Sequence, residues 1–404
     1  GGFDAVIGNP PYGAVLTKSD ISYFSEHYPN TPSTSDTYML FVEKCLELSR
    51  SNAKFAMIIP NTWTLLFNAQ KFRRYLFENY TIEQIVHFNH RVFPKVTVDC
   101  EILVACNAPP QGNEVEITLQ NLDDSIRYSV LQEDWIKKNG DIISIRQTSE
   151  ASKIVNKLEI LSVRMEDICE IKNGIKPFEV GKGTPPQTKA IASSKPFVSD
   201  TKDDNSFVPL LRGSLINRYR TLWNRNYWVS YGPWLAAPRD PHIFFTVPRK
   251  IVVRQTGDSL IATIIDNTYV CRNNMHMVFL KQEQGYSLDY LLGILNSRLM
   301  NWYYQIINPE QGEALAEIKA AHLYRFPIRL NDPTNPTDVA QHDRLVALVQ
   351  QMLDLHRRAA TEANPQLKTV VQRQIDATDK QIDRLVYGLY GLTEEEVAIV
   401  EGVG

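Results

Sequence analysis

The 404-residue sequence is poor in the features that mark metalloproteins and membrane proteins. Its five cysteines form no CxxC pair, and its eight histidines show neither HxxxH nor HExxH spacing, so no metal site is expected. No stretch of about 18 apolar residues occurs, so no membrane span and no membrane partner are expected. An odd number of cysteines, mostly in apolar runs, indicates a reduced, cytoplasmic protein.

A strong positive charge is also lacking. The net charge is -3 and the isoelectric point is about 6.3, which argues against a generally basic nucleic-acid binder. A local basic face remains compatible with this balance, because phosphates respond to nearby charge. The content of 43% hydrophobic and 22% charged residues is that of a globular protein. A chain of this length is expected to form two or three domains.

The first 110 residues alternate between short apolar runs and amphipathic segments, a pattern typical of an α/β fold. The apolar run Phe3–Gly8 is predicted to be a buried strand that ends in an Asn-Pro-Pro turn. Because helices separate the strands, we expect a parallel or mostly parallel sheet. Further strands are predicted at residues 54–60, 84–88 and 101–106, and helices at 36–50 and 69–79.

Beyond residue 110 the composition changes, and we divide the chain accordingly. Residues 1–110 form one domain, 111–164 a connector, 165–330 a second domain and 331–404 a helical C-terminal region. The second domain is rich in β-branched and aromatic residues with frequent proline and glycine, as in an α+β domain. Short strands are predicted at 249–254, 259–265 and 275–280, a helix at 287–304, and a helical hairpin at 338–360 and 366–387.

The tetrapeptide Asn9-Pro10-Pro11-Tyr12 is the strongest chemical signal, expected by chance in roughly one chain of this length per thousand. The Asn9 side-chain oxygen and the Pro10 carbonyl can each accept an N–H of an exocyclic amine, which frees the nitrogen lone pair for methylation. The two prolines fix the backbone rigidly, and Tyr12 offers an aromatic face to a flipped base. The alternative is a plain turn in which Tyr12 belongs to the core.

A basic, aromatic zone follows at residues 210–254, where eight basic residues accompany a single acid. Such a mixture can hold phosphates and can read or stack bases. The alternative is the core of a β-rich domain with arginines that extend to its surface. The candidate DNA-binding residues are Arg212, Arg218, Arg220, Arg225, Arg239 and Arg254.

Residues 2–13 resemble motif IV of the amino-methyltransferases that use S-adenosylmethionine, and residues 36–63 resemble the segment that follows it in gamma-type, adenine-specific enzymes. The resemblance implies N6-adenine as the methyl acceptor, although protein glutamine methyltransferases carry the same tetrapeptide. It also implies that Phe93 packs on the flipped adenine; a loop aromatic before a strand otherwise packs in the core. The glycine-rich cofactor motif of the family is expected before Gly1.

Residues 170–176, 208–212, 250–264 and 290–304 resemble the target-recognition domain of TaqI-type enzymes, and residues 382–400 the closing segment of restriction–modification polypeptides. The fold implied is the C-terminal half of a Rossmann-like methyltransferase sheet, a mixed α/β recognition domain and a C-terminal helical hairpin. The implied partners are double-stranded DNA and an upstream methyltransferase segment of the same polypeptide, with any nuclease segment also upstream.

The leading prediction is a site-specific DNA adenine-N6 methyltransferase of a restriction–modification enzyme, in which this chain is a fragment that is inactive by itself. One alternative is a DNA specificity module without catalysis. Another is a methyltransferase that acts on protein glutamine or on RNA. The sequence does not reveal the recognition sequence, the oligomeric state or which arginines contact bases.

Overall fold

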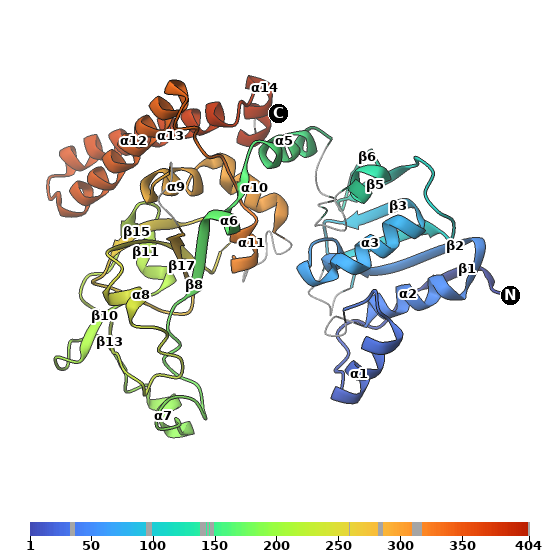
Figure 1. The fold of residues 1–404 in the computed structure, drawn as a ribbon, viewed down its shortest axis with the longest axis horizontal. Helices are drawn as coiled ribbons and strands as arrows, with labels where there is room; N and C mark the ends of the chain where they lie inside the picture. Colours follow the sequence, from blue (N-terminus) through green and yellow to red (C-terminus); the bar gives the residue numbers. More distant parts are fainter. Residues whose placement is uncertain are drawn as a thin grey trace. The chain divides into compact units, whose positions relative to one another are not determined.

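The computed structural model divides the chain into two compact units, Gly1–Lys153 and Ile154–Gly404 (Figure 1). Within the described ranges, none of the helices combines the length and apolar character that crossing a membrane requires. The residues described are 1–32, 37–93, 99–137, 143, 145, 149–257, 259–281, 286–308 and 317–402.

The first unit is built on one six-stranded sheet. Its strands are β1 (Phe3–Gly8), β2 (Ser49–Pro60), β3 (Thr81–Phe88), β4 (Cys100–Cys106), β5 (Glu114–Gln120) and β6 (Ser125–Leu131). They lie in the order β1-β2-β4-β3-β5-β6. β1 pairs parallel with β2, and β3 with β5, whereas the other three pairings are antiparallel.

The expectation of a parallel or mostly parallel sheet is therefore wrong. Residues 89–99 are all that separate β3 from β4, whereas a parallel crossover needs about a dozen residues or more. The chain consequently returns antiparallel between β2 and β3.

The sheet also continues past residue 110, into the segment predicted to be a connector. β5 and β6 both lie there, and Val115, Ile117 and Leu119 of β5 point into the core at the strand period of two. The chain passes to the second unit only within α5 (Ser149–Ile160). The predicted boundaries at residues 110 and 164 thus differ from the division of the structure.

Helices of the first unit bury one face each in the core of the sheet. In α2 (Tyr38–Leu48), Tyr38, Val42 and Leu46 lie one turn apart and join the same buried cluster as the β2 side chains. In α3 (Gln70–Asn79), Phe72 and Leu76 do the same. The helices predicted at 36–50 and 69–79 are confirmed; the start of the first lies outside the described residues. The remaining helices of this unit are α1 (Lys18–His27) and α4 (Gln132–Lys137).

β1 is a strand as predicted, but it is not buried. Its only described neighbour is β2, so one edge of the strand is open. Phe3 is 60% exposed and Ile7 is 83% exposed. Phe3 and Ile7 lie on the same face of the strand, and apolar composition predicts burial only where another layer covers that face.

The second unit contains two four-stranded sheets and two short ladders, β11-β12 and β18-β7. One sheet has the order β15-β14-β17-β8 and is antiparallel throughout, while the other has the order β16-β10-β13-β9 and contains one parallel pair, β10 with β16. The strands are β7 (Val163–Arg164), β8 (Cys169–Asn173), β9 (Val198–Ser199), β10 (Phe207–Leu211), β11 (Ile216–Asn217), β12 (Arg220–Thr221), β13 (Trp228–Ser230), β14 (Arg249–Arg254), β15 (Ala262–Asp266), β16 (Val270–Cys271), β17 (Met275–Leu280) and β18 (Pro327–Ile328).

Two long helices, α12 (Pro336–Thr361) and α13 (Pro365–Leu389), form the predicted helical hairpin and pack on α9 (Leu288–Leu295) (Figure 1). Asn335 and Asn364 cap the two long helices through their side-chain oxygens. The helix predicted at 287–304 is interrupted, because Ser297 caps a new helix, α10 (Arg298–Ile307). The other helices are α6 (Met165–Ile168), α7 (Lys189–Ser194), α8 (His242–Phe245), α11 (Ala320–Tyr324) and α14 (Glu394–Glu401).

Gly293 of α9 lies against α12, whereas Gly388 of α13 lies in open space. A larger side chain should therefore destabilise the protein at the first position only. A Cβ at Gly293 would lie 2.9 Å from side-chain carbons of Leu345 and Val349, whereas a Cβ at Gly388 meets nothing within 4 Å. Gly293→Val should lower the free energy of unfolding by about 1–3 kcal/mol through overpacking. Gly388→Val, the matched control, should change it by less than about 0.5 kcal/mol. Urea denaturation of both variants measures the difference, and equal stabilities would contradict this packing.

Candidate functional site

The Asn-Pro-Pro-Tyr turn begins directly after β1 and lies at the carboxyl end of the parallel β1–β2 pair. Parallel pairing holds Gly8 opposite Met57 of β2, so the position of the turn is fixed by an interior strand of the sheet. Asn9 and Pro11 are exposed, Pro10 is buried and Tyr12 is half-buried. The turn thus presents a polar side chain to solvent while a buried proline anchors its backbone.

The turn has one acceptor that receives a hydrogen bond from the protein and two acceptors that receive none from the described residues. The Pro11 carbonyl accepts a hydrogen bond from Thr37 Oγ1 at 2.9 Å. In the part of the chain that the structure describes, no group donates to the Asn9 side chain or to the Pro10 carbonyl. Two neighbouring acceptors are therefore unpaired within the described residues, and we call them the open acceptors; their number matches the two N–H donors of an exocyclic amine.

Tyr12 is held by its hydroxyl, which donates to the Ile58 carbonyl at 2.9 Å. Burial, reinforced by the neighbouring Cys100, raises the pKa of Tyr12 far above its ordinary value. The phenol is therefore neutral at physiological pH and does not act as a base. Its ring is consequently an aromatic surface fixed beside the two open acceptors.

Phe93 contacts Tyr12, with ring centroids 6.4 Å apart and planes inclined at 64°. This edge-to-face contact brings the two predicted base-stacking residues together. A base sandwiched between two rings needs parallel planes about 7 Å apart, twice the 3.4 Å stacking distance. The observed pair leaves no such gap, so a base entering between them would have to displace Phe93. The stacking role of Phe93 stays a prediction.

A buried carboxylate that the sequence did not single out supports the strand ends near this turn. Glu101 on β4 accepts hydrogen bonds from Trp63 Nε1 at 3.1 Å and from His87 Nδ1 at 3.0 Å. Glu101 and His87 are fully buried, which is tolerable only because both are hydrogen-bonded. The next residue along β4 towards the turn is Cys100, the neighbour of Tyr12. Nothing in the alternating apolar pattern of β4 distinguished this glutamate from an exposed one.

In the second unit, two of the six candidate arginines lie on the β11–β12 hairpin, facing the helical hairpin. The Arg218 guanidinium forms two hydrogen bonds with the Asp379 carboxylate, at 2.6 and 3.0 Å, and another with the Asn296 carbonyl. Arg218 therefore connects the β11–β12 hairpin to helix α13. Burial, together with the neighbouring Arg220 and Arg218, lowers the pKa of His356 to about 4, so this imidazole is neutral at pH 7.

Arg225 and Arg239 occupy exposed turns with left-handed backbone angles, φ 66° and φ 63°. The Arg239 side chain donates through Nε to the Gly174 carbonyl at 3.2 Å. Gly174 itself packs on the backbone after β16, since a Cβ there would lie 2.2 Å from the Cys271 carbonyl oxygen. Arg239 is thereby brought to the turn that follows β16, whereas no contact places Arg225 there.

The same turn gathers three further arginines. Arg272 begins it, and its backbone N–H donates to the Leu211 carbonyl at 2.9 Å, next to Arg212. The Gly213 N–H donates to Asn274 Oδ1 at 3.3 Å, and Arg254 packs over Gly213, where a Cβ would lie 3.2 Å from its Cγ. We call this group the arginine cluster. Its members are Arg212, Arg239, Arg254 and Arg272.

Among the described residues, no member of the arginine cluster has a carboxylate within ion-pairing distance. Arg218 and Arg249, by contrast, are paired with Asp379 and Asp289. The positive charge of the cluster is therefore available to an anionic ligand, although the chain as a whole is acidic. Sequence analysis missed Arg272 because it lies outside the basic zone and reaches the cluster only through strand pairing.

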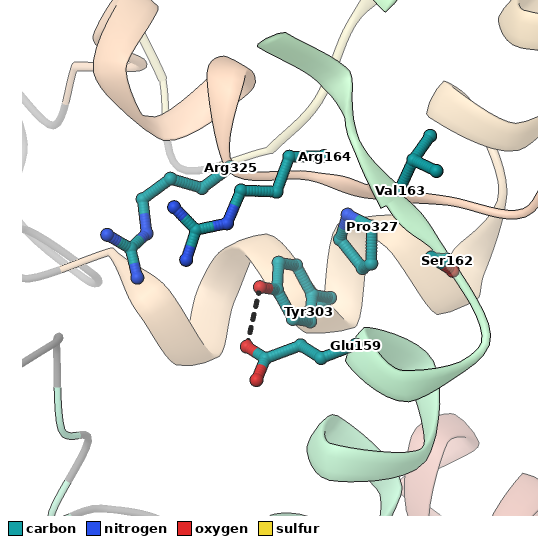
Figure 2. Close-up of a pocket in the computed structure, with 7 residues that line it drawn as sticks. All are labelled: Glu159, Ser162, Val163, Arg164, Tyr303, Arg325 and Pro327. Carbon is teal, nitrogen blue, oxygen red and sulfur yellow. Dashed lines mark hydrogen bonds between the residues drawn. The ribbon is translucent and has the colours of Figure 1, made fainter. Parts of the chain in front are cut away.

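A small charged pocket lies elsewhere in the second unit, and Figure 2 shows the guanidinium groups of Arg164 and Arg325 side by side in it. The Tyr303 hydroxyl donates to Glu159 Oε1 at 3.2 Å across its wall. Its volume of about 180 Å³ is below the roughly 300 Å³ at which small-molecule sites begin. The pocket is therefore too small for a nucleoside-sized methyl donor.

Comparison with known families gives one match in each unit. Residues 1–93, which include the Asn-Pro-Pro-Tyr turn, match the Eco57I restriction-modification methylase family. Residues 208–328, which include all four members of the arginine cluster, match the TaqI-like C-terminal specificity domain. The two matched segments are thus similar to parts of restriction–modification methyltransferases.

Curated relatives of this kind are longer than the chain. A type II restriction enzyme and methyltransferase of Escherichia coli, RM.Eco57I, is 22% identical over 99% of this chain and 47% of its own length. A putative type II restriction enzyme and methyltransferase of Methanocaldococcus jannaschii is 24% identical over 75% of this chain and 25% of its own. The chain therefore spans between a quarter and half of these two relatives.

A solved structure of the type IIL restriction–modification enzyme MmeI in complex with DNA has a similar fold. The TM-score is 0.60 at 12% sequence identity, with 99% of this chain and 56% of that chain covered. An identity this low supports the fold alone. The fold, a mixed six-stranded sheet followed by a mixed α/β unit and a helical hairpin, is thus similar to that of this enzyme.

The tight backbone contact of Gly174 predicts that a single methyl group disrupts the arginine cluster. In Gly174→Ala, the new Cβ would meet the carbonyl oxygens of Cys271 and Arg272 at 2.2 and 2.3 Å, and backbone atoms cannot yield cheaply. We expect a loss of about 3 kcal/mol or more in the free energy of unfolding of the second unit. The matched control is Gly388→Ala, where the new Cβ meets no atom within 4 Å. This exchange should leave the free energy of unfolding unchanged or raise it. A Gly174→Ala protein of unchanged stability would refute this packing.

Proposed function

We propose that this chain is the base-binding and DNA-recognition part of a site-specific DNA adenine-N6 methyltransferase of a restriction–modification enzyme. The observation that carries the proposal is the pair of open acceptors, the Asn9 side chain and the Pro10 carbonyl, on a turn within the methylase family match. Two acceptors on a rigid backbone suit an amine that offers two N–H groups.

The proposed chemistry requires orientation and needs no strong base. A target adenine leaves the duplex, because an exocyclic nitrogen cannot be reached inside the base stack. Asn9 Oδ1 and the Pro10 carbonyl accept the two N6 hydrogens and draw the nitrogen lone pair out of conjugation. The Tyr12 ring, fixed through Ile58, lies against the base. The prolines keep the acceptors in place, so little reorganisation accompanies the reaction.

S-adenosylmethionine is the methyl donor in this proposal and supplies an electrophilic methyl group when bound. The described residues around Asn9 do not fit a whole cofactor site, since the one acidic residue of β1, Asp4, is paired with Arg50 and no G-x-G turn follows the strand. One face of β1 exposes Phe3 and Ile7, which suits a further layer of the methyltransferase fold. We propose that such a layer, outside this chain, completes the cofactor site.

Double-stranded DNA is the proposed substrate because the arginine cluster lies in the part that matches a specificity domain. Four guanidinium groups without carboxylate partners among the described residues suit a polyanion. The match to the specificity domain also supports a second candidate, a DNA specificity module without catalysis. The two differ in whether Asn9 matters to any reaction.

Substitution of Asn9 separates these two candidates. In the intact restriction–modification polypeptide, Asn9→Ala should lower the methylation rate about 100-fold or more, because one of two acceptors is removed. Duplex binding should be nearly unchanged, since the arginine cluster is untouched. Asn79→Ala, at the exposed end of α3, is the matched control and should retain full activity. Near-normal turnover by Asn9→Ala would refute the catalytic role and leave the specificity module.

The open face of β1 leads to a prediction about the cofactor. The chain by itself should bind S-adenosylmethionine weakly, with a dissociation constant above about 1 mM, because it provides only one side of the site. Restoring the upstream part of the polypeptide should restore both binding and methylation. Isothermal titration calorimetry measures the affinity of the chain, and micromolar binding would contradict the prediction.

A further inference from the structure

Strand pairing in the second unit places two arginines side by side. β10 and β16 are parallel and in register, with Leu210 opposite Val270 and Leu211 opposite Cys271. The next residues on the two strands are Arg212 and Arg272. Adjacent strands lie about 4.8 Å apart, so the two arginines leave their strands as immediate neighbours.

Two neighbouring guanidinium groups repel each other unless something separates or neutralises them. Both guanidinium groups contact the same aromatic side chain, Tyr227. The Arg212 Cζ lies 4.7 Å from the centroid of the Tyr227 ring, and Arg272 Nη1 donates to the Tyr227 hydroxyl at 2.9 Å. Tyr227 directly precedes β13, the antiparallel neighbour of β10 on its other side. Three strands thus deliver one side chain each to the same assembly.

The two arginines are used differently in this assembly. Arg272 donates one N–H to the tyrosine hydroxyl, whereas Arg212 lies over the ring face and makes no polar contact with Tyr227. Within the described ranges, all five N–H donors of Arg212 lack an acceptor. The contact with the Tyr227 ring restricts the orientation of the Arg212 guanidinium group. Tyr227 is only 7% exposed, so the support itself is rigid.

We propose that Arg212 is a specificity-determining residue that reads the edge of a guanine, with Tyr227 and Arg272 as its positioning residues. The donor fork of arginine matches the O6 and N7 acceptors of guanine in two parallel hydrogen bonds. The same fork also matches two phosphate oxygens, but only a base contact makes the loss of the fork depend on the DNA sequence. A guanidinium held in one orientation is of use where the angle of the fork decides binding. The proposal rests on the proposed function, since it assumes that this unit binds duplex DNA.

Selection from a pool of randomised duplexes, followed by sequencing of the bound fraction, tests the proposal with the full chain. The wild-type protein should enrich guanine at a defined position. Arg212→Lys keeps the charge and loses the fork, so this preference should fall by about 5- to 150-fold. Tyr227→Phe keeps the ring and removes the acceptor of Arg272, so the preference should weaken less. The matched control is Arg357→Lys, a like exchange at an exposed position of α12 that is paired with Asp354.

Each other outcome identifies what has failed. If Arg212→Lys weakens binding equally for all sequences, Arg212 contacts a phosphate and the proposal is wrong. If guanine enrichment is the same as in Arg357→Lys, Arg212 does not read the base, and the proposal is again wrong. A wild-type chain that binds no duplex contradicts the proposed function as well. Thermal unfolding of each variant shows that a changed preference does not come from loss of the fold.

Discussion

Parallel pairing of neighbouring strands positions the chemistry in both units. In the first unit, β1 runs parallel to β2 and its carboxyl end carries Asn9 and Pro10. In the second unit, β10 runs parallel to β16, and their carboxyl ends carry Arg212 and Arg272. Both strands of a parallel pair end on the same side, so residues far apart in sequence become neighbours there. The functional groups therefore depend on strand register, and a one-residue slip would redirect them.

Some arginines of the second unit form ion pairs within the fold, whereas others have no carboxylate partner among the described residues. Several pair with carboxylates of the helices, and the side chains of two of those carboxylates, Asp289 and Asp383, are only 5% exposed. A buried carboxylate needs such a partner, since an uncompensated charge inside the fold costs several kcal/mol. The arginine cluster, by contrast, has no carboxylate within ion-pairing distance among the described residues. The arginines used by the helices are Arg218, Arg249, Arg298 and Arg329.

The sequence predicted correctly those helices and strands that depend on the spacing of neighbouring apolar residues. Helix-period apolar positions located α2, α3 and the α12–α13 hairpin, and β14 and β17 were predicted at their observed bounds. Long-range determinants were not visible: the exposure of β1 depends on which layer covers it, and the fate of Arg218 depends on Asp379, far along the chain. Arg272 was missed for the same reason. The turn at Asn9 was found because its chemistry lies in four consecutive residues.

The two candidate sites are complementary in their unsatisfied hydrogen-bonding groups. The turn after β1 presents acceptors without donors, and the arginine cluster presents donors without carboxylates, both within the described residues. A nucleic acid offers the matching halves, since its exocyclic amines donate while its phosphates and guanine edges accept. A protein substrate supplies a side-chain amide for the first site but no polyanion for the second. The combination of both kinds of open group in one chain therefore favours DNA over protein glutamine as the substrate of the proposed enzyme.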